Sequence, residues 1–320
     1  TKQVIALGFI SAILIGAVVL SLPVSSADGS FTPFIDSLFT STTSVCVTGL
    51  VVVTTATHWS LFGKVVILIL IQLGGLGIIS FTTGIMMVIG RRITLRDRMI
   101  LEDALNLDTL KGLVRFLQRI FKGTFMVESI GAVCYSLVFI PQYGIIKGVW
   151  FSIFHSVSAF CNAGIDILGE NSLVPYVSNP WINIVTMGLI ITGGIGFLVW
   201  WDITNNIKKM AQHEYTPKMA VKKLHIHSKI VIITTLCLVF GGALLIFALE
   251  FNNPETIGNL SFFEKIQASL FQSVVLRTAG FMTFSQAGMH GTSIIVCLFL
   301  MFIGGSSIST SGGIKTTTFS

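Results

Sequence analysis

Three glycines at near-equal spacing are the residues of this 320-residue sequence best suited to chemistry. Gly49, Gly164 and Gly280 lie 115 and 116 residues apart, and each is followed by an apolar residue. Glycine has no Cβ, so it can turn its carbonyl oxygen toward an axis in backbone conformations that other residues avoid. Carbonyl oxygens arranged in this way can replace the hydration shell of a cation. The spacing therefore predicts three equivalent loops that line one cation pathway.

The elements that must position these loops are membrane helices. The sequence is 52% hydrophobic and only 11% charged, a composition typical of a protein that resides in a lipid bilayer. A helix needs about 20 apolar residues to cross the hydrocarbon core, and six stretches qualify, the last of them short. The six predicted spans are 3–22, 62–89, 113–140, 181–201, 230–251 and 289–303.

The glycine loops fall between these spans in a regular order. Each glycine is preceded by a half-helical apolar pattern that is too short and too polar to be a span. The repeating unit is therefore a span, a re-entrant half-helix with its loop, and a second span. Two full spans return the chain to its starting side, so the copies are parallel. We predict an all-α polytopic membrane protein with tandem parallel helix, re-entrant pore loop and helix repeats around one ion pore, at 1–108, 109–222 and 223–320.

A glycine pair also recurs in the second span of each unit. The pairs, which fall 25, 29 and 24 residues after the loop glycines, are Gly74-Gly75, Gly193-Gly194 and Gly304-Gly305. For the first two pairs, and for Gly77 and Gly196 that follow them, we expect close helix packing, with further apolar helix after them. The third pair is followed by hydroxyl side chains, which a packed helix does not need. We expect residues 304–315 to be unwound, with hydroxyls and carbonyls lining water; a kinked helix is the alternative.

The basic residues are concentrated in two stretches. Of twenty Lys and Arg residues, fourteen lie in 91–122 and 208–229, and the net charge is +6. Because cytoplasmic loops of membrane proteins are enriched in Lys and Arg, both stretches are predicted to be cytoplasmic. The basicity therefore reports topology, and no nucleic-acid partner is expected. We expect a multi-pass protein of the cell membrane.

The motifs around the loop glycines resemble those of a known family. They are "TSVCVTGL", "SAFCNAGID" and "LRTAGF", together with the closing run "GGSSISTSGGIKTTT". Over the whole chain they are similar to the Trk/Ktr/HKT superfamily of potassium transporters, most closely its Ktr-type membrane subunits. The resemblance implies a potassium-conducting pore built from four such units in one chain. Three are present, the third cut off in its second span, and we expect a fourth repeat beyond Ser320 in a longer protein.

The resemblance implies roles for two sets of residues. The first is a K⁺ selectivity filter made of backbone carbonyls, with K⁺ as the only metal ion and no other cofactor in this chain. Its residues are Cys46, Val47, Thr48, Gly49, Cys161, Asn162, Ala163, Gly164, Arg277, Thr278, Ala279 and Gly280. The second is an intramembrane gating loop that obstructs the pore. Its residues are Gly304, Gly305, Ser306, Ser307, Ile308, Ser309, Thr310, Ser311, Gly312, Gly313 and Lys315.

The resemblance also implies partners and a function. It implies a homodimer of membrane subunits that carries a cytosolic regulatory ring of the KtrA type, with the nucleotide bound by that partner. The expected function is potassium uptake through a gated pore. The alternative is an ion-coupled (Na⁺ or H⁺) secondary carrier, in which Glu128 would be the coupling group. A polytopic membrane enzyme or scaffold, with glycines that only pack, is a third class. The sequence contains no G-x-S-x-G, H-E-x-x-H or G-x-x-x-x-G-K-[ST] motif, so no enzyme is expected.

Three polar residues inside apolar stretches are expected to need partners within the protein. Arg277 lies in the third loop, and we expect its side chain to point behind the loop and pair with Glu264 or with an acid beyond this sequence. A structural hydrogen bond to a neighbouring helix is the second interpretation of Glu128, since an intramembrane acid needs a partner or water. Gln72 receives the same structural interpretation.

Overall fold

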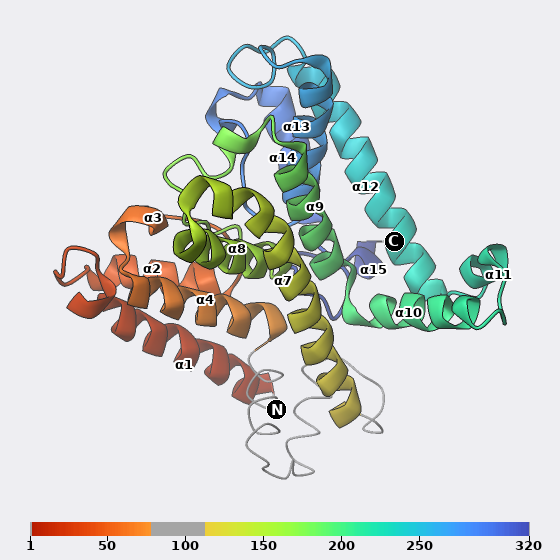
Figure 1. Cartoon of the computed structure of the whole chain (residues 1–320), viewed down its shortest axis with the longest axis horizontal. Helices are drawn as coiled ribbons and strands as arrows, with labels where there is room; N and C mark the ends of the chain where they lie inside the picture. The colour runs from red at the N-terminus through yellow and green to blue at the C-terminus, as the bar shows by residue number, and fades with distance from the viewer. Residues whose placement is uncertain (1, 78–112, 320) are drawn as a thin grey trace.

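The computed structural model describes residues 2–77 and 113–319 of the chain. Within these residues the regular structure is helical, and the two isolated β-bridges, Ser26 with Trp59 and Ile303 with Ile314, belong to no strand. The helices follow one another in three groups, red to orange, yellow to green and cyan to blue in Figure 1. Each group contains a first helix, a shorter second helix and a third helix.

The bounds of the helices are as follows. The first group has α1 (Lys2–Ser21), α2 (Phe34–Val45), α3 (Thr55–His58) and α4 (Leu61–Leu76). The second group has α7 (Leu113–Tyr143), α8 (Ile145–Phe160), α9 (Pro180–Ile195), α10 (Phe197–Ala211) and α11 (Pro217–Lys222). The third group has α12 (Ile226–Glu250), α13 (Phe262–Val275), α14 (Gly291–Phe302) and α15 (Thr316–Phe319). Three 3₁₀ turns lie at Pro23–Ser25, Val174–Tyr176 and Gln286–Gly288.

Several helices have the length and composition of membrane helices. Among the described residues, α7 over Phe116–Tyr143 and α12 are long and apolar enough to cross a bilayer, and α9 with α10 would make a third but for a 102° bend. Large apolar side chains such as Ile15 and Leu244 are exposed, as expected where lipid surrounds a helix. The predicted all-α membrane fold is confirmed. Of the two basic stretches, 208–229 is described, whereas 91–112 lies outside the described residues.

The predicted span 181–201 is wrong as a single helix. α9 ends at Ile195, Gly196 has a φ of +94°, and α10 then leaves at the 102° angle. A Cβ at Gly196 would lie 2.7 Å from the carbonyl oxygen of Ser307, so this bend needs a residue without a side chain. Apolar composition alone does not reveal such a bend, because the first five residues of α10, 197–201, are all apolar.

In the first group, the third helix ends at the equivalent position. α4 ends at Leu76, and Gly77 has a φ of +78°. The further apolar helix expected directly after the first glycine pair is therefore interrupted as well. The rest of the predicted span 62–89 lies outside the described residues.

One contact recurs in all three groups. A serine of the second helix donates its hydroxyl to a carbonyl of the first helix, at 2.7, 2.6 and 2.8 Å. The donor and acceptor residues are Ser41 with Ile13, Ser156 with Glu128, and Ser273 with Val239. Three residues after each acceptor, a glycine makes room for that serine, at Gly16, Gly131 and Gly242. The three groups are therefore built alike, while the repeat boundaries stay a prediction.

Candidate functional site

The three loop glycines meet at one place, although they are far apart in the sequence. Gly49, Gly164 and Gly280 have φ angles of +79°, +63° and +84°. A Cβ placed on Gly280 would lie 3.2 Å from the Cα of Gly49 and 3.3 Å from that of Gly164. A Cβ on Gly164 would collide with the carbonyl oxygen of Ala279. In this arrangement the gap between the glycines is thus narrower than a methyl group.

A second backbone feature is shared by the three loops. The residue two positions before each glycine is left-handed, with φ of +55° at Val47, +58° at Asn162 and +68° at Thr278. Valine and threonine are β-branched and rarely adopt this conformation. Such a residue costs on the order of 1–3 kcal/mol and persists only where the surroundings fix it. The repeated strain indicates one backbone shape, built three times.

Short helices lead into all three loops. α2, α8 and α13 are 12, 16 and 14 residues long and end at Val45, Phe160 and Val275, directly before the loops. The last carbonyls of a helix lack intrahelical partners and carry partial negative charge. Three helix ends therefore place negative potential beside the loops, which favours a cation over an anion.

A hydroxyl residue of the preceding helix holds each of the first two loops. In the first loop, Thr43 accepts two hydrogen bonds of 2.9 Å: its carbonyl oxygen accepts from Thr48 N, and its side-chain Oγ1 accepts from Leu50 N. In the second loop, the carbonyl oxygen of Ser158 accepts from Ala163 N at 2.8 Å. The Oγ of Ser158 donates to the carbonyl oxygen of Ile165, the residue after the glycine, at 2.5 Å. Each loop is therefore anchored to its own short helix on both sides of the glycine.

The third loop is anchored differently. Val274 stands at the position of Thr43 and Ser158 and has no hydroxyl. Instead, Thr278 Oγ1 donates to Ser311 Oγ at 3.0 Å and accepts from Gly312 N at 3.2 Å. Ala279 N still donates to the carbonyl oxygen of Val275 at 2.9 Å, so the third loop keeps a backbone tie to α13, but its side-chain anchor lies in the segment predicted to be the gating loop.

The side chain of Arg277 runs from the third loop toward the end of α14. Its Nη2 donates to the carbonyl oxygen of Gly304 at 3.3 Å, and the residue is only 6% exposed. The predicted pairing with Glu264 is wrong, because Glu264 caps the opposite end of α13, where its Oε2 accepts from Ser261 N at 2.9 Å. Within the described residues, no carboxylate forms an ion pair with this guanidinium.

Residues 303–315 form a non-helical segment between α14 and α15. The segment closes on itself: Gly304 N donates to Ile314 O at 2.9 Å, and Gly305 N donates to Ser311 Oγ at 2.7 Å. Lys315 Nζ donates to the carbonyl of Ser311 at 2.7 Å. The backbone is thus unwound, and the alternative of a kinked helix does not fit this geometry.

This segment also bridges the ends of α8 and α9. Three hydrogen bonds of 2.9 Å make the bridge, from Ser306 N to Gly194 O, from Phe197 N to Ile308 O and from Thr310 Oγ1 to Phe160 O. The side chains of Ser306, Thr310 and Ser311 are buried. The expectation that the hydroxyls line water is wrong for these three, because they make contacts within the protein.

The glycine pairs bring the third helices close to the loops. A Cβ on Gly74 would collide with the carbonyl oxygen of Val45, and one on Gly193 would collide with that of Phe160. A Cβ on Gly75 would lie 2.6 Å from Cys161 Sγ. These glycines have the close packing expected of them, and the packing supports the loops from outside.

A buried polar cluster lies behind the second loop. Gln72 Nε2 donates to both carboxylate oxygens of Glu128, at 2.9 and 3.0 Å, and Cys161 Sγ donates to Gln72 Oε1 at 3.3 Å. The structural interpretation had been made for Gln72 and for Glu128 separately, and no sequence pattern indicates that they pair. The cluster joins α4, α7 and the start of the second loop, so Glu128 is engaged in structural contacts.

The chain resembles known transport proteins over nearly its whole length. The family model described as TrkH, cation transport protein, matches residues 4–320. The potassium/sodium uptake protein NtpJ of Enterococcus hirae is 42% identical over 316 residues, which cover 99% of this chain and 67% of that protein. The Ktr system potassium uptake protein B is 41% identical in Bacillus subtilis and 36% identical in Vibrio alginolyticus, covering 99% of this chain and 68% and 67% of those proteins.

A solved structure shares the fold. The crystal structure of the potassium transporter TrkH from Vibrio parahaemolyticus matches with a TM-score of 0.65 at 21% identity, covering 98% of this chain. It shows the same type of helical membrane fold. The chain spans 59% of that protein and about two thirds of the length of the relatives above.

Proposed function

Because the chain belongs to the TrkH family of cation transport proteins, we propose that it is the channel-like, pore-forming membrane subunit of a Ktr-type system for potassium uptake. Family membership makes it a transport protein, not an enzyme. The observation that carries the proposal is the convergence of Gly49, Gly164 and Gly280, each with positive φ, at the ends of three short helices. The names of the relatives support K⁺ as the ion.

In this proposal K⁺ binds to backbone carbonyls of the three loops and is the substrate, with no resident cofactor. The filter is formed by residues 46–49, 161–164 and 277–280. The shared left-handed backbone supports one carbonyl arrangement in all three loops.

Residues 304–313 and 315 act as the gate in this proposal. Its support is the set of hydrogen bonds that join this segment to the third loop and to the ends of α8 and α9. Movement of the segment would therefore displace one wall of the pathway. The trigger is a cytosolic ring of nucleotide-binding subunits of the KtrA type, bound to a homodimer in the plasma membrane. The "Ktr system" names of relatives support a membrane subunit that works with other components.

The ion-coupled carrier is not favoured. Both carboxylate oxygens of Glu128 accept hydrogen bonds from Gln72, which leaves this acid in a structural role. A channel-like subunit also explains why the loops, and not one acidic site, are the feature that repeats.

Potassium uptake by the full-length protein tests the proposal directly. Cells that lack their own potassium uptake systems should grow at low external K⁺ and accumulate rubidium when they produce the protein. The physical reason is that a passive pore lets K⁺ follow the membrane potential inward. A protein that is well expressed in the membrane and gives no rescue, alone or with its regulatory subunit, would contradict the proposal.

A further inference from the structure

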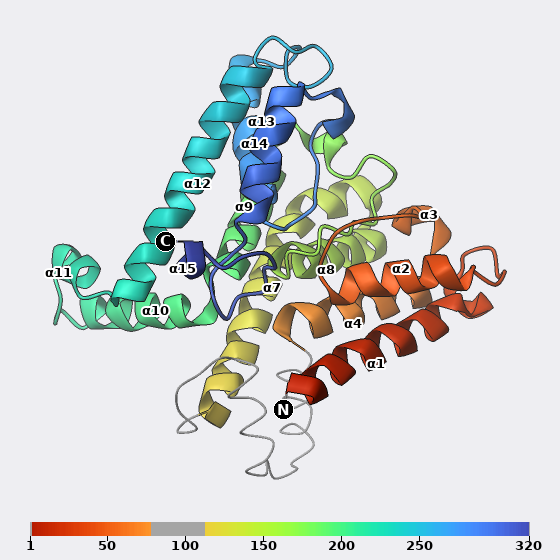
Figure 2. The ribbon, with the colours of Figure 1, turned by 180° about the vertical axis from the view of Figure 1, so that it is seen from behind.

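α10 runs across the direction of the membrane helices. It leaves α9 at 102°, and in both Figure 1 and Figure 2 it lies steeply inclined to α12, whose first turn is beside it. Since α12 is long and apolar enough to span the bilayer, a helix lying across its end runs along the membrane surface. α10 is therefore placed at the level of the phospholipid headgroups.

The sequence of α10 fits this placement. Ile203, Ile207 and Met210 follow one another at steps of four and three residues, so they lie on one side of the helix. Ile207 is 52% exposed, Met210 is 36% exposed and Ile203 is half-buried, so the described protein leaves the middle and the end of this stripe open. Lys208 and Lys209 are exposed on other sides. Apolar side chains that face the acyl region, with lysines reaching to the headgroups, are the pattern of an interfacial helix.

Positive charge gathers where α10, α11 and α12 meet. Lys218, Lys222 and Lys223 of this elbow, residues 203–229, are exposed in addition to the two lysines of α10. Glu214 is the one carboxylate of the sequence between residues 203 and 249. Within the described part of the chain, none of these lysines forms an ion pair. The elbow therefore presents unneutralised positive charge.

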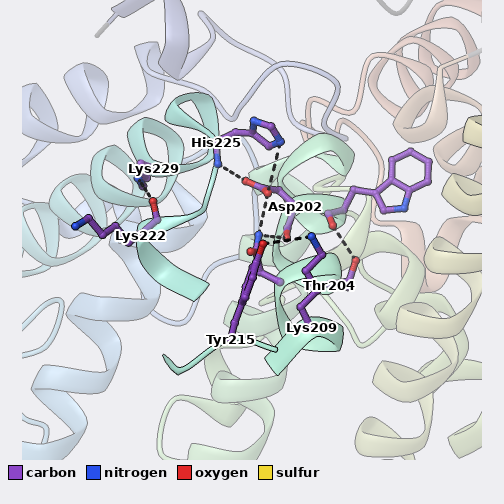
Figure 3. A network of polar contacts seen from close by, with 9 residues as sticks. Asp202, Thr204, Lys209, Tyr215, Lys222, His225 and Lys229 are labelled. Atoms are coloured by element: carbon purple, nitrogen blue, oxygen red, sulfur yellow. Dashed lines mark hydrogen bonds and ion pairs between the residues drawn. The ribbon is translucent and has the colours of Figure 1, made fainter. Parts of the chain in front are cut away.

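Hydrogen bonds fix the shape of the elbow (Figure 3). Asp202 Oδ2 accepts from His225 N at 2.7 Å, which joins α10 to the start of α12. Lys229 Nζ donates to the carbonyl oxygen of Lys222 at 2.8 Å, which joins α12 to α11. Lys209 Nζ donates to Tyr215 OH at 3.3 Å. The lysines thus project from an ordered scaffold, which lowers the entropy cost of binding.

A cavity of about 450 Å³ lies beside this surface but is unsuited to an anion. Its lining includes the buried carboxylate of Asp202, which repels negative charge. The other lining residues are Leu198, Trp201, Asn205, His225, His227 and Ser228. The candidate surface is therefore the exposed lysines, not the cavity.

We propose that the elbow binds anionic phospholipid headgroups of the leaflet that it faces. Polybasic segments next to membrane helices are attracted to anionic lipid, and each lysine near such a surface strengthens binding roughly fivefold. The apolar stripe of α10 supplies the second contribution, by entering the acyl region. This inference goes beyond ion conduction and does not depend on which ion the protein carries.

The test compares phosphatidylglycerol with phosphatidylcholine. The full-length protein in detergent is titrated with each lipid, and bound lipids are counted by native mass spectrometry. The variant replaces Lys208, Lys209, Lys222 and Lys223 with Gln; the matched control replaces the same four residues with Arg, which keeps the charge. Wild type and the Arg variant should prefer phosphatidylglycerol, and the Gln variant should lose about tenfold or more of that preference.

Three results would overturn the inference. They are an unchanged preference in the Gln variant, no preference in wild type, and a loss of preference in the Arg variant equal to that in the Gln variant. No preference in wild type is also the outcome expected if the lysines serve an acidic protein surface instead. A second measurement tests whether the apolar stripe enters the bilayer. In vesicles containing phosphatidylglycerol, a fluorophore attached to Met210→Cys should be quenched by nitroxide-labelled lipids. Absence of quenching would contradict the placement of α10.

Discussion

At the residue scale, the glycines differ in what a methyl group would meet. We predict that Gly164→Ala abolishes potassium uptake or its selectivity over sodium. The added Cβ would collide with the carbonyl oxygen of Ala279, and the φ of +63° strains any side chain. Rubidium uptake with and without competing sodium measures both effects. Gly188→Ala on α9 is the matched control, because nothing lies within 4 Å of its Cβ; unchanged selectivity in Gly164→Ala would contradict the filter assignment.

Gln72 and Glu128 give a second prediction at this scale. Gln72→Leu removes both hydrogen bonds to a buried carboxylate, which should cost about 1–3 kcal/mol or more if the acid is charged. The midpoint of thermal unfolding in detergent should fall. Gln72→Leu combined with Glu128→Leu should recover most of the loss, because the buried carboxylate is then removed with its partner and only the weak thiol donor of Cys161 is left unpaired. Additive losses in the double variant would show that the two residues act independently.

Sequence reasoning identified single residues better than it identified their partners. The spacing of Gly49, Gly164 and Gly280 was enough to bring three distant loops together, because a repeat carries spatial information. The partner of Arg277 was not predictable: a charge inside an apolar stretch suggests an acid, yet the structure supplies the carbonyl oxygen of Gly304. Backbone acceptors carry no residue signature in a sequence.

At the element scale, the unwound segment after α14 acts as a bridge. We predict that deleting residues 306–311 raises the basal potassium flux, because the bridge to the ends of α8 and α9 is lost. Thr310→Val is a milder variant that removes the hydrogen bond to Phe160 O and should raise flux in the same direction. Flux in proteoliposomes measures both. Thr204→Val, on exposed α10, is the control; unchanged or lower flux in folded deletion protein would contradict a gating role.

The helix breaks show where hydropathy is insufficient. Helices α1, α7, α12 and α14 lie where the apolar runs predicted them. The break at Gly196 was missed, because the five residues after it, 197–201, are as apolar as a continuing span, and polar residues begin only at Asp202. The pair Gly193-Gly194 predicted close packing. The signal for the bend is Gly196, two residues further along, which is the one of these three glycines with a positive φ.

At the scale of the whole molecule, topology can be tested without measuring transport. Lys218, in α11, belongs to a basic stretch predicted to be cytoplasmic. Lys147, at the start of α8, lies between the predicted spans 113–140 and 181–201, so one crossing separates it from each basic stretch and it is expected to face outward. We predict that an impermeant maleimide labels Lys147→Cys in intact cells, whereas Lys218→Cys is labelled only after permeabilisation. The unsubstituted protein gives the background from its native cysteines. The opposite pattern would invert the proposed orientation.

Val274 shows how a pore made of fused repeats can differ from one wall to the next. A channel assembled from identical subunits must alter every wall of its pore when one position mutates. In a chain of fused copies, one wall can change alone. Val274 lacks the hydroxyl found at Thr43 and Ser158, so the side-chain anchor of the third loop comes from another segment, whereas the first two loops carry their own. In the proposed pore, this side-chain anchor makes the third wall differ from the other two.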